Sequence, residues 1–286
     1  MRLLLVLACS LPLWAWGNEC QQETNATAGQ CTEPGQWHFA LAAGAGHRSN
    51  PLNGGHNFPL WLIPDLSYYG KHWFFDNGTL GYNLQLNSAL QLSLVSRLNE
   101  ERGYFRRADA SNMFSQSLVS EMGLAGPVQK MATAPELSID NLAKRPTAVD
   151  GGLQLDWFLP NMQLRANWWH DISGQYHGQH ASVSVSTGWQ SSFGHWQLSS
   201  SLLWKNADLI NTYYGVTEQQ YFSSYYQTGS SWQPELKLSW SYPLTPDWSA
   251  LAFYRHRFLD DAMTNSPLVN EGHIRSWFVG VTYQFF

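Results

Sequence analysis

The residues with the greatest chemical potential lie between positions 170 and 182. His180 and Ser182 stand two apart on one predicted strand, the spacing with which some membrane lipid hydrolases attack an acyl ester. Such a site has to face lipid, whereas Val183 and Val185 take the apolar side of this strand. The alternation therefore favours a polar lining pair, and lipid hydrolysis is the least favoured function considered.

Other residues of the right types fall near this strand or further along the chain. His170, Asp171, His177 and His180 could ligate a metal by residue type, but their spacing matches no strong metal pattern. The acidic pair Asp260–Asp261 could serve an aspartyl protease, although a structural corner is the better interpretation. The sequence accordingly predicts no enzyme, with no catalytic residue, no metal site and no cofactor.

The composition points to a membrane protein made of strands. Of the 286 residues, 13% are charged and 15% aromatic, whereas soluble domains carry about 25% charged residues. The mean hydropathy is −0.31, and beyond residue 17 no apolar run approaches the roughly 20 residues of a spanning helix. With a net charge of −5, the protein is not expected to bind nucleic acid.

The first residues have the character of an export signal. A positive start and an apolar run over residues 1–17 predict a cleaved signal peptide. Cleavage leaves Cys20 and Cys31 as an even pair, which we expect to form a disulfide in an oxidising compartment. Residues 18–35 are then a periplasmic N-terminal extension.

From residue 36 onward the dominant sequence period is two. Met162, Leu164, Ala166 and Trp168 alternate with polar residues, and several other segments repeat the pattern. Because successive side chains of a strand point to opposite faces, each segment has one apolar and one polar wall. A soluble sandwich would turn the apolar wall inward, and an outer-membrane barrel would turn it to lipid.

Strand length, aromatic rows and loop lengths favour the barrel. Many segments have about ten residues, as bilayer crossing requires, and their apolar rows often end in Trp or Tyr. Connections alternate between short and long, as expected for short periplasmic turns and long external loops. The sequence thus predicts an all-β transmembrane antiparallel barrel over 36–286. The long external loop spans 99–146, and a short helix is expected at 112–124.

The expected strand count is twelve, with ten as the alternative. The weakest expected strand is 72–76, where Asn77-Gly78 would form a tight hairpin turn. The expected strands are 36–46, 59–69, 72–76, 79–86, 89–98, 147–158, 162–171, 179–190, 195–206, 230–242, 247–258 and 273–286.

The polar walls of these strands would line the interior of the barrel. Mixed charges there could interlock as a plug or line a narrow water path, and twelve strands leave both possibilities open. A small-solute porin is therefore the leading alternative function. The predicted lumen-lining residues are Arg165, His180, Lys205, Glu235, Lys237, Arg255 and Arg257.

The last strand resembles the signal that the barrel-assembly machinery reads. It alternates and ends in aromatic residues, as bacterial outer-membrane proteins typically do. The residues of this predicted signal are Trp277, Val279, Val281, Tyr283, Phe285 and Phe286.

Several short motifs together resemble the MltA-interacting protein family (MipA/OmpV) from about Trp37 to Phe286. They occur in a specific order and at specific spacing, and one departure is Asn265, where the family usually has Asp. The motifs are Phe74-Phe75, Gly81-Tyr82, Tyr213-Tyr214-Gly215-Val216, Ser231-Trp232-Gln233-Pro234-Glu235-Leu236, Asp247-Trp248-Ser249 and Asn265-Ser266-Pro267-Leu268-Val269.

The resemblance implies a non-enzymatic scaffold in the outer membrane of a Gram-negative bacterium. The expected partners are membrane lipid, the barrel-assembly machinery during biogenesis, a murein lytic transglycosylase and a murein synthase. The murein enzymes would have to bind the short periplasmic turns or the extension that carries Cys20 and Cys31, because only these face the periplasm.

Overall fold

The computed structural model describes residues 35–105, 145–217 and 225–285, and within them one antiparallel sheet dominates. The expected helix at 112–124, the two cysteines and Phe286 lie outside the described residues. The strands are β1 (Trp37–Arg48), β2 (Phe58–Pro59), β3 (Leu62–Tyr69), β4 (Trp73–Asp76), β5 (Thr79–Gln85), β6 (Leu90–Leu98), β7 (Val149–Leu159), β8 (Met162–Asp171), β9 (Gln179–Ser191), β10 (Gly194–Lys205), β11 (Ser231–Pro243), β12 (Trp248–Phe258) and β13 (His273–Gln284). The helices are η1 (Glu101–Phe105), α2 (Ala207–Tyr214) and α3 (Asp261–Thr264).

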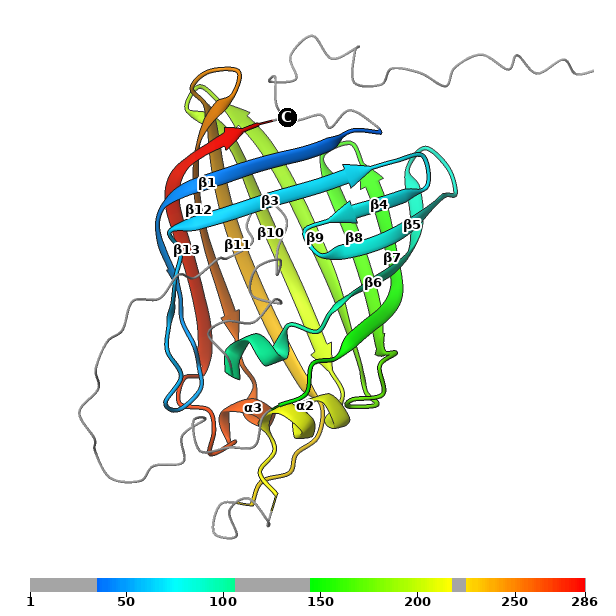
Figure 1. Ribbon diagram of the computed structural model, residues 1–286, viewed down its shortest axis with the longest axis vertical. Coiled ribbons are helices and arrows are strands. Elements are labelled where there is room, and N and C mark those ends of the chain that lie inside the picture. The colour runs from blue at the N-terminus through cyan, green and yellow to red at the C-terminus, as the bar shows by residue number, and fades with distance from the viewer. Residues whose placement is uncertain (1–34, 106–144, 218–224, 286) are drawn as a thin grey trace, which may run out of the picture. The chain divides into compact units, whose positions relative to one another are not determined.

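The sheet closes on itself to form a barrel (Figure 1). Consecutive strands pair in order, and β13 returns to β1 in a continuous register from Ala40↔Gln284 to Arg48↔Ser276. The two-residue β2 extends the pairing of β3 with β1 beyond a break at Leu60 and Trp61. Counted this way, the barrel has twelve strands, which confirms the predicted architecture. No helix among the described residues is long and apolar enough to cross a membrane.

Side chains alternate between the two faces of the barrel as their period-two pattern predicts. On β13, Trp277 and Val279 are 40% and 58% exposed, whereas Ser276 and Phe278, which alternate with them, are fully buried. Leu94 and Val183, on strands elsewhere around the barrel, are likewise more than half exposed. An apolar belt turned outward suits a bilayer and has no stable place in water.

The weakest expected strand is present because of its turn. Asn77 and Gly78 both have positive φ angles, 46° and 88°, as a two-residue hairpin of this type requires. The side chain of Asn77 also accepts a hydrogen bond from the Leu66 amide (3.0 Å) and donates to Asp76 (2.9 Å). This short turn joins β4 to β5 as separate strands rather than as one kinked strand.

The inner face is less uniformly polar than the alternation suggested. One buried apolar cluster forms where β1, β3, β12 and β13 meet, and its largest members are Phe253 and Phe278. The ring of Phe278 lies where a Cβ at Gly280 would come within 2.7 Å of it, so the small residue makes room for the ring. A second cluster joins Phe74, Val95 and Trp169. These side chains fill parts of the interior that polar residues alone would leave hydrated.

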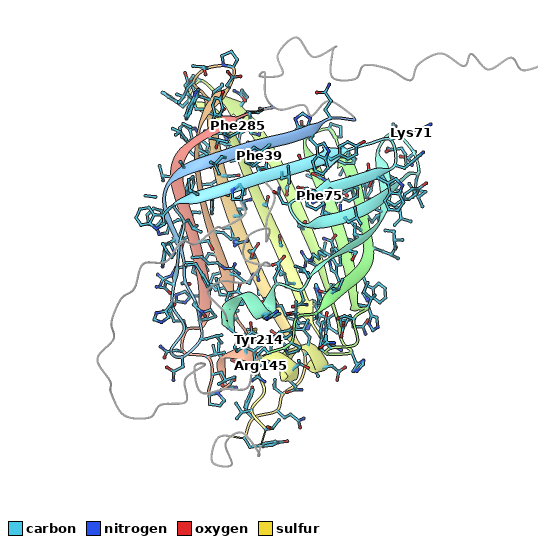
Figure 2. All side chains as sticks on the ribbon, viewed as in Figure 1. Phe39, Lys71, Phe75, Arg145, Tyr214 and Phe285 are labelled. Atoms are coloured by element: carbon cyan, nitrogen blue, oxygen red, sulfur yellow. The ribbon has the colours of Figure 1, made fainter. Side chains whose placement is uncertain are left out.

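The long connections all leave the same end of the barrel, where the helices also lie (Figure 1). We call this the loop end, and the opposite end the turn end. Tyr214 and Arg145 lie at the loop end, while Phe39 and Phe285 mark the turn end (Figure 2). Because the strands are strictly antiparallel, alternate connections leave opposite ends of the barrel. The long connections are all among those that leave the loop end.

Candidate functional site

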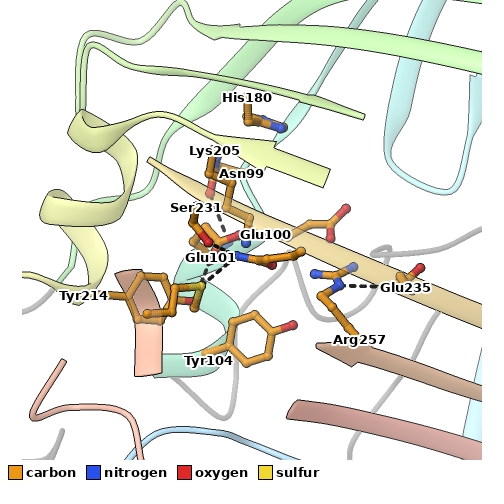
Figure 3. Close-up of polar contacts among 12 residues, drawn as sticks. Asn99, Glu100, Glu101, Tyr104, His180, Lys205, Tyr214, Ser231, Glu235 and Arg257 are labelled. Atoms are coloured by element: carbon orange, nitrogen blue, oxygen red, sulfur yellow. Dashed lines mark hydrogen bonds and ion pairs between the residues drawn. The ribbon is translucent and has the colours of Figure 1, made fainter. Parts of the chain in front are cut away.

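The loop end of the barrel interior holds a group of polar side chains joined by ion pairs and hydrogen bonds (Figure 3). We call this group the loop-end network, and its members are Asn99, Glu101, Asp150, Tyr176, His180, Lys205, Tyr214, Glu235 and Arg257. Its central carboxylate is Glu101 in η1, whose Oε1 lies 2.7 Å from Lys205 Nζ at the end of β10. Tyr214 of α2 donates its hydroxyl to Glu101 Oε2 at 2.6 Å. The buried ion pair thereby joins η1 to the consecutive elements β10 and α2, which lie about 100 residues further along the chain.

The electrostatics of this ion pair favour a charged Glu101. Burial by itself would raise the pKa of this carboxyl, but the Lys205 ammonium, the Tyr214 hydroxyl and the Arg257 charge lower it to about 2. Burial beside Glu101 raises the pKa of Tyr214 well above its usual value, so this hydroxyl remains a donor. At neutral pH Glu101 is therefore ionised. Its carboxylate accepts hydrogen bonds and has no proton to donate.

A second carboxylate, Asp150, organises the neighbouring strands β7 and β9. It is fully buried, and it accepts hydrogen bonds from Asn99 Nδ2 (2.8 Å) and the Tyr176 hydroxyl (2.6 Å). His180 Nε2 lies 3.0 Å from its Oδ2. Because Asp150 is shared among three groups, His180 is positioned by the fold rather than left open to an external substrate.

The remaining charges of this region are also paired. Arg257 Nε lies 2.7 Å from Glu235 Oε2, and Arg97 Nη1 lies 2.8 Å from Glu100 Oε1. The Arg97 guanidinium also covers the ring of Trp169, 4.4 Å from its centroid. A small cavity between these pairs is lined by Arg97, Asn99, Glu100, Glu101, His180, Leu203, Lys205, Leu209 and Arg257. Its wall combines matched charges, which suits a plug better than a binding site for one charged ligand.

An apolar core covers the network on its outer side. It gathers buried side chains from α2, α3 and the loops around them, among them Tyr213, Tyr214, Met263 and Leu268. Ser266 Oγ donates to the carbonyl oxygen of Tyr214 at 2.6 Å, which ties the α3 corner to the end of α2. Loops packed in this way form a lid over the interior.

The predicted lumen-lining residues lie in three regions of the barrel. Lys205, Glu235, Arg257 and His180 belong to the loop-end network, and Lys237 and Arg255 are register partners on β11 and β12. Arg165 lies apart from them and pairs with Asp156, Nε to Oδ1, at 2.6 Å. The sequence reasoning missed Glu101, Asp150 and Tyr214 as members of the network, although the motif around Tyr214 was noted.

The candidates for catalysis and metal binding are not brought together. Ser182 Oγ accepts a hydrogen bond from Asn167 Nδ2 at 3.2 Å, while His180 contacts Asp150. His170 stacks on Trp168. Asp171 orders its own loop by accepting hydrogen bonds from backbone amides, including that of His177 at 2.9 Å. No group of three potential metal ligands occurs within the described ranges.

The acidic corner has a structural part in the described chain. Asp260 accepts hydrogen bonds from Ser231 Oγ (2.8 Å) and the Trp232 amide (2.5 Å). It thereby fixes the beginning of β11, and with it the 231–236 motif, beside the α3 corner. This agrees with its interpretation as a corner residue.

The closed sheet, its outward apolar belt and the paired charges inside its loop end define a β-barrel of the outer-membrane type. The chain belongs to the family of the MltA-interacting protein MipA, whose family model matches residues 41–285. The predicted family resemblance is therefore confirmed. Its motifs at 213–216, 231–236 and 265–269 meet in the lid and at the edge of the loop-end network.

Two relatives extend over most of the chain. The MltA-interacting protein of Escherichia coli K12 is 23% identical over 250 residues, covering 86% of this chain and 90% of the relative. The putative outer membrane protein YiaT of Escherichia coli O157:H7 is 22% identical over 255 residues, covering 86% and 91%. Both names fit an outer-membrane barrel of this family.

Two solved structures are also similar to this chain. The NanC porin aligns with a TM-score of 0.41 and 11% identity, covering 86% of this chain and 98% of the porin. OmpF of Salmonella typhi, in complex with daunomycin, aligns with a TM-score of 0.36 and 10% identity, covering 87% and 97%.

Proposed function

We propose that the protein is a non-enzymatic scaffold of the outer membrane that holds murein-remodelling enzymes at its turn end. The observation that carries this proposal is the closed loop end, where paired charges and the apolar lid fill the interior. A filled barrel suits a rigid platform better than an enzyme or an open pore. The name of the relative, MltA-interacting protein, supports a lytic transglycosylase as the partner.

The turn end offers an exposed apolar surface for this partner. Phe193, in the turn between β9 and β10, is 76% exposed, and Leu244, after β11, is 53% exposed. The two turns are neighbours, because Trp240 Nε1 of β11 donates to the Phe193 carbonyl oxygen at 2.6 Å. Apolar tips on neighbouring turns are suitable anchors for a protein interface. The N-terminal extension with Cys20 and Cys31 is a further proposed contact, outside the described residues.

The test is a binding measurement with the full-length barrel in detergent. Immobilised wild type and the double variant Phe193→Ser/Leu244→Ser are titrated with a purified MltA-type transglycosylase and, separately, with a murein synthase. We expect the double variant to bind roughly tenfold more weakly, as loss of interface anchors implies. The matched control is Ile172→Ser, at an equally exposed apolar position (62%) at the loop end.

The outcome of this comparison decides the proposal. Binding of the double variant at the wild-type level would show that the apolar tips are not the contact. Equal loss of binding in Ile172→Ser would show that the effect is not specific to the turn end. If the wild type binds neither enzyme, the proposed scaffold function is contradicted.

A small-solute pore is the second candidate, and one observation favours it. The register pairs Glu235↔Arg257 and Lys237↔Arg255 place three cations and one carboxylate at neighbouring inward positions, and such an excess of one charge is more stable beside water than in a dry core. Planar-bilayer recordings separate the functions. A scaffold gives no current steps, whereas a pore gives discrete steps that should change when Lys237→Gln/Arg255→Gln removes both charges.

Export and membrane insertion are part of the same proposal. Residues 1–17 would direct secretion and be cleaved, the loop end would face outward, and the turn end would face the periplasm of a Gram-negative cell. Heat-modifiable migration of the protein in the outer-membrane fraction, with the mature N-terminus near residue 18, is the expected result. Recovery in the soluble fraction would contradict it.

A further inference from the structure

One cationic side chain of the barrel differs from all others on the described strands. Eight Lys and Arg residues lie on these strands, and seven share the inward face. The exception is Arg275 on β13, which is exposed in the same outward row as Trp277 and Val279. The seven inward residues are Arg48, Arg97, Arg165, Lys205, Lys237, Arg255 and Arg257.

Arg275 lies within a group of imidazoles. His256 on β12 is its direct register partner, and His273 precedes it by two residues on the same face. The rings of His256 and His273 stack with centroids 5.3 Å apart. The acidic neighbour is Glu271, whose Oε2 lies 3.7 Å from His273 Nε2, at the rim of the group. We call Arg275, His256 and His273 the outer basic patch.

The height of this patch on the barrel is fixed by an aromatic pair. Tyr254 and Trp277 are register partners in the next outward row toward the turn end, and both are at least 40% exposed. Exposed Tyr and Trp rows mark the boundary between acyl chains and headgroups. The outer basic patch therefore lies just beyond the acyl chains, on the loop side of the membrane.

At this position an outward charge is stable only if lipid headgroups contact it. An outward Arg costs about 2–4 kcal/mol at the bilayer midplane and about 0–1 near the interface. A guanidinium presents paired donors that match a phosphate, and neighbouring imidazoles add further donors. We propose that the outer basic patch of Arg275, His256 and His273 binds the phosphate of a lipid headgroup in the leaflet at the loop end.

The flanking side chains explain why a lipid phosphate suits the site better than a free anion. Trp277 is 40% exposed and Val279 is 58% exposed on the membrane side of the patch. His47 of β1 lies beside Trp277, with ring centroids 6.4 Å apart, and extends the polar edge. A headgroup phosphate at Arg275 would place its acyl chains over these apolar side chains. A free phosphate would gain none of that contact.

The test is native mass spectrometry of the full-length barrel in detergent, titrated with diphosphorylated lipid A as the probe. Wild type is compared with Arg275→Gln, with Arg275→Lys and with Lys71→Gln, the last removing an exposed cation from the turn between β3 and β4. We expect Arg275→Gln to weaken binding roughly tenfold, as loss of a charge-assisted hydrogen bond implies. Arg275→Lys should recover part of it, and Lys71→Gln should match wild type.

Two further titrations separate a lipid from a free anion. Dephosphorylated lipid A should bind the wild type no better than it binds Arg275→Gln, and inorganic phosphate should not displace lipid A at equal concentration. The proposal is overturned if Arg275→Gln binds lipid A like wild type while its barrel remains heat-modifiable. Displacement by equimolar inorganic phosphate would also overturn it, because the site would then recognise a free anion.

Discussion

Lys205 Nζ lies 2.7 Å from Glu101 Oε1, and the two side chains are 6% and 7% exposed. The pair joins the end of β10 to η1, and the hydroxyl of Tyr214 adds α2 to the same carboxylate. The longest connection of the barrel begins beside this ion pair, and the pair therefore helps to hold the loop end closed from inside the barrel. The stability of the lid should therefore depend on a few buried charges as well as on its apolar core.

Replacing Lys205 with Met should destabilise the folded barrel by about 3–5 kcal/mol, because Glu101 would remain buried without its counter-charge. Urea unfolding in lipid vesicles, followed by tryptophan fluorescence, measures the change. The double variant Lys205→Met/Glu101→Gln should recover most of the loss, since Gln is neutral and can still accept from Tyr214. No recovery in the double variant would contradict a charge effect.

The same carboxylate predicts a dependence of stability on acid. Glu101 has a folded-state pKa of about 2 against an ordinary value of 4.5. Its contribution is fully present above pH 4.5 and is lost as the pH falls from 4.5 toward 2. The difference in urea midpoint between wild type and Glu101→Gln should therefore shrink across this window. A difference that stays constant from pH 6 to pH 3 would contradict it.

The tight turn between β4 and β5 gives a test of local geometry. Asn77→Ala should destabilise the barrel by about 2 kcal/mol, since it removes the acceptor for the half-buried Leu66 amide and strains a left-handed residue. Urea midpoints measure the loss. Asn87→Ala is the matched control, because Asn87 also accepts an amide hydrogen bond in a turn but is exposed. Its effect should stay within about 0.5 kcal/mol.

The strands and the Asn77-Gly78 turn could be predicted because their signals are local. A period of two needs only neighbouring residues to reveal which face a side chain takes. The loop-end network joins residues far apart in the chain, such as Tyr214 and Glu101, 113 positions away. Residues 99–146 have no such periodic pattern, so no local signal indicates that Glu101 lies beside Lys205.

The interior apolar clusters were missed for a related reason. Val95 and Trp169 share the inward face with polar residues, and only the strand register brings them to Phe74. A sequence pattern indicates which face a side chain takes. It does not indicate which inward side chains pack together and exclude water. The motifs around Tyr214 and Ser266 indicate the family, but only the fold brings Ser266 Oγ to the carbonyl oxygen of Tyr214 in the lid.

The end of the chain tests the proposed assembly signal separately from packing. Phe285 stacks on Phe39 with ring centroids 5.0 Å apart, and its amide donates to the Phe39 carbonyl oxygen at 2.9 Å. Phe285→Ala and Phe39→Ala remove the same ring contact, but only Phe285→Ala alters the proposed signal. In cells, Phe285→Ala should slow the appearance of the heat-modifiable barrel severalfold, while Phe39→Ala should assemble at nearly the wild-type rate. In refolding without the assembly machinery, both variants should be affected alike. Equal delay of the two variants in cells would assign the role of Phe285 to packing at the β1–β13 seam.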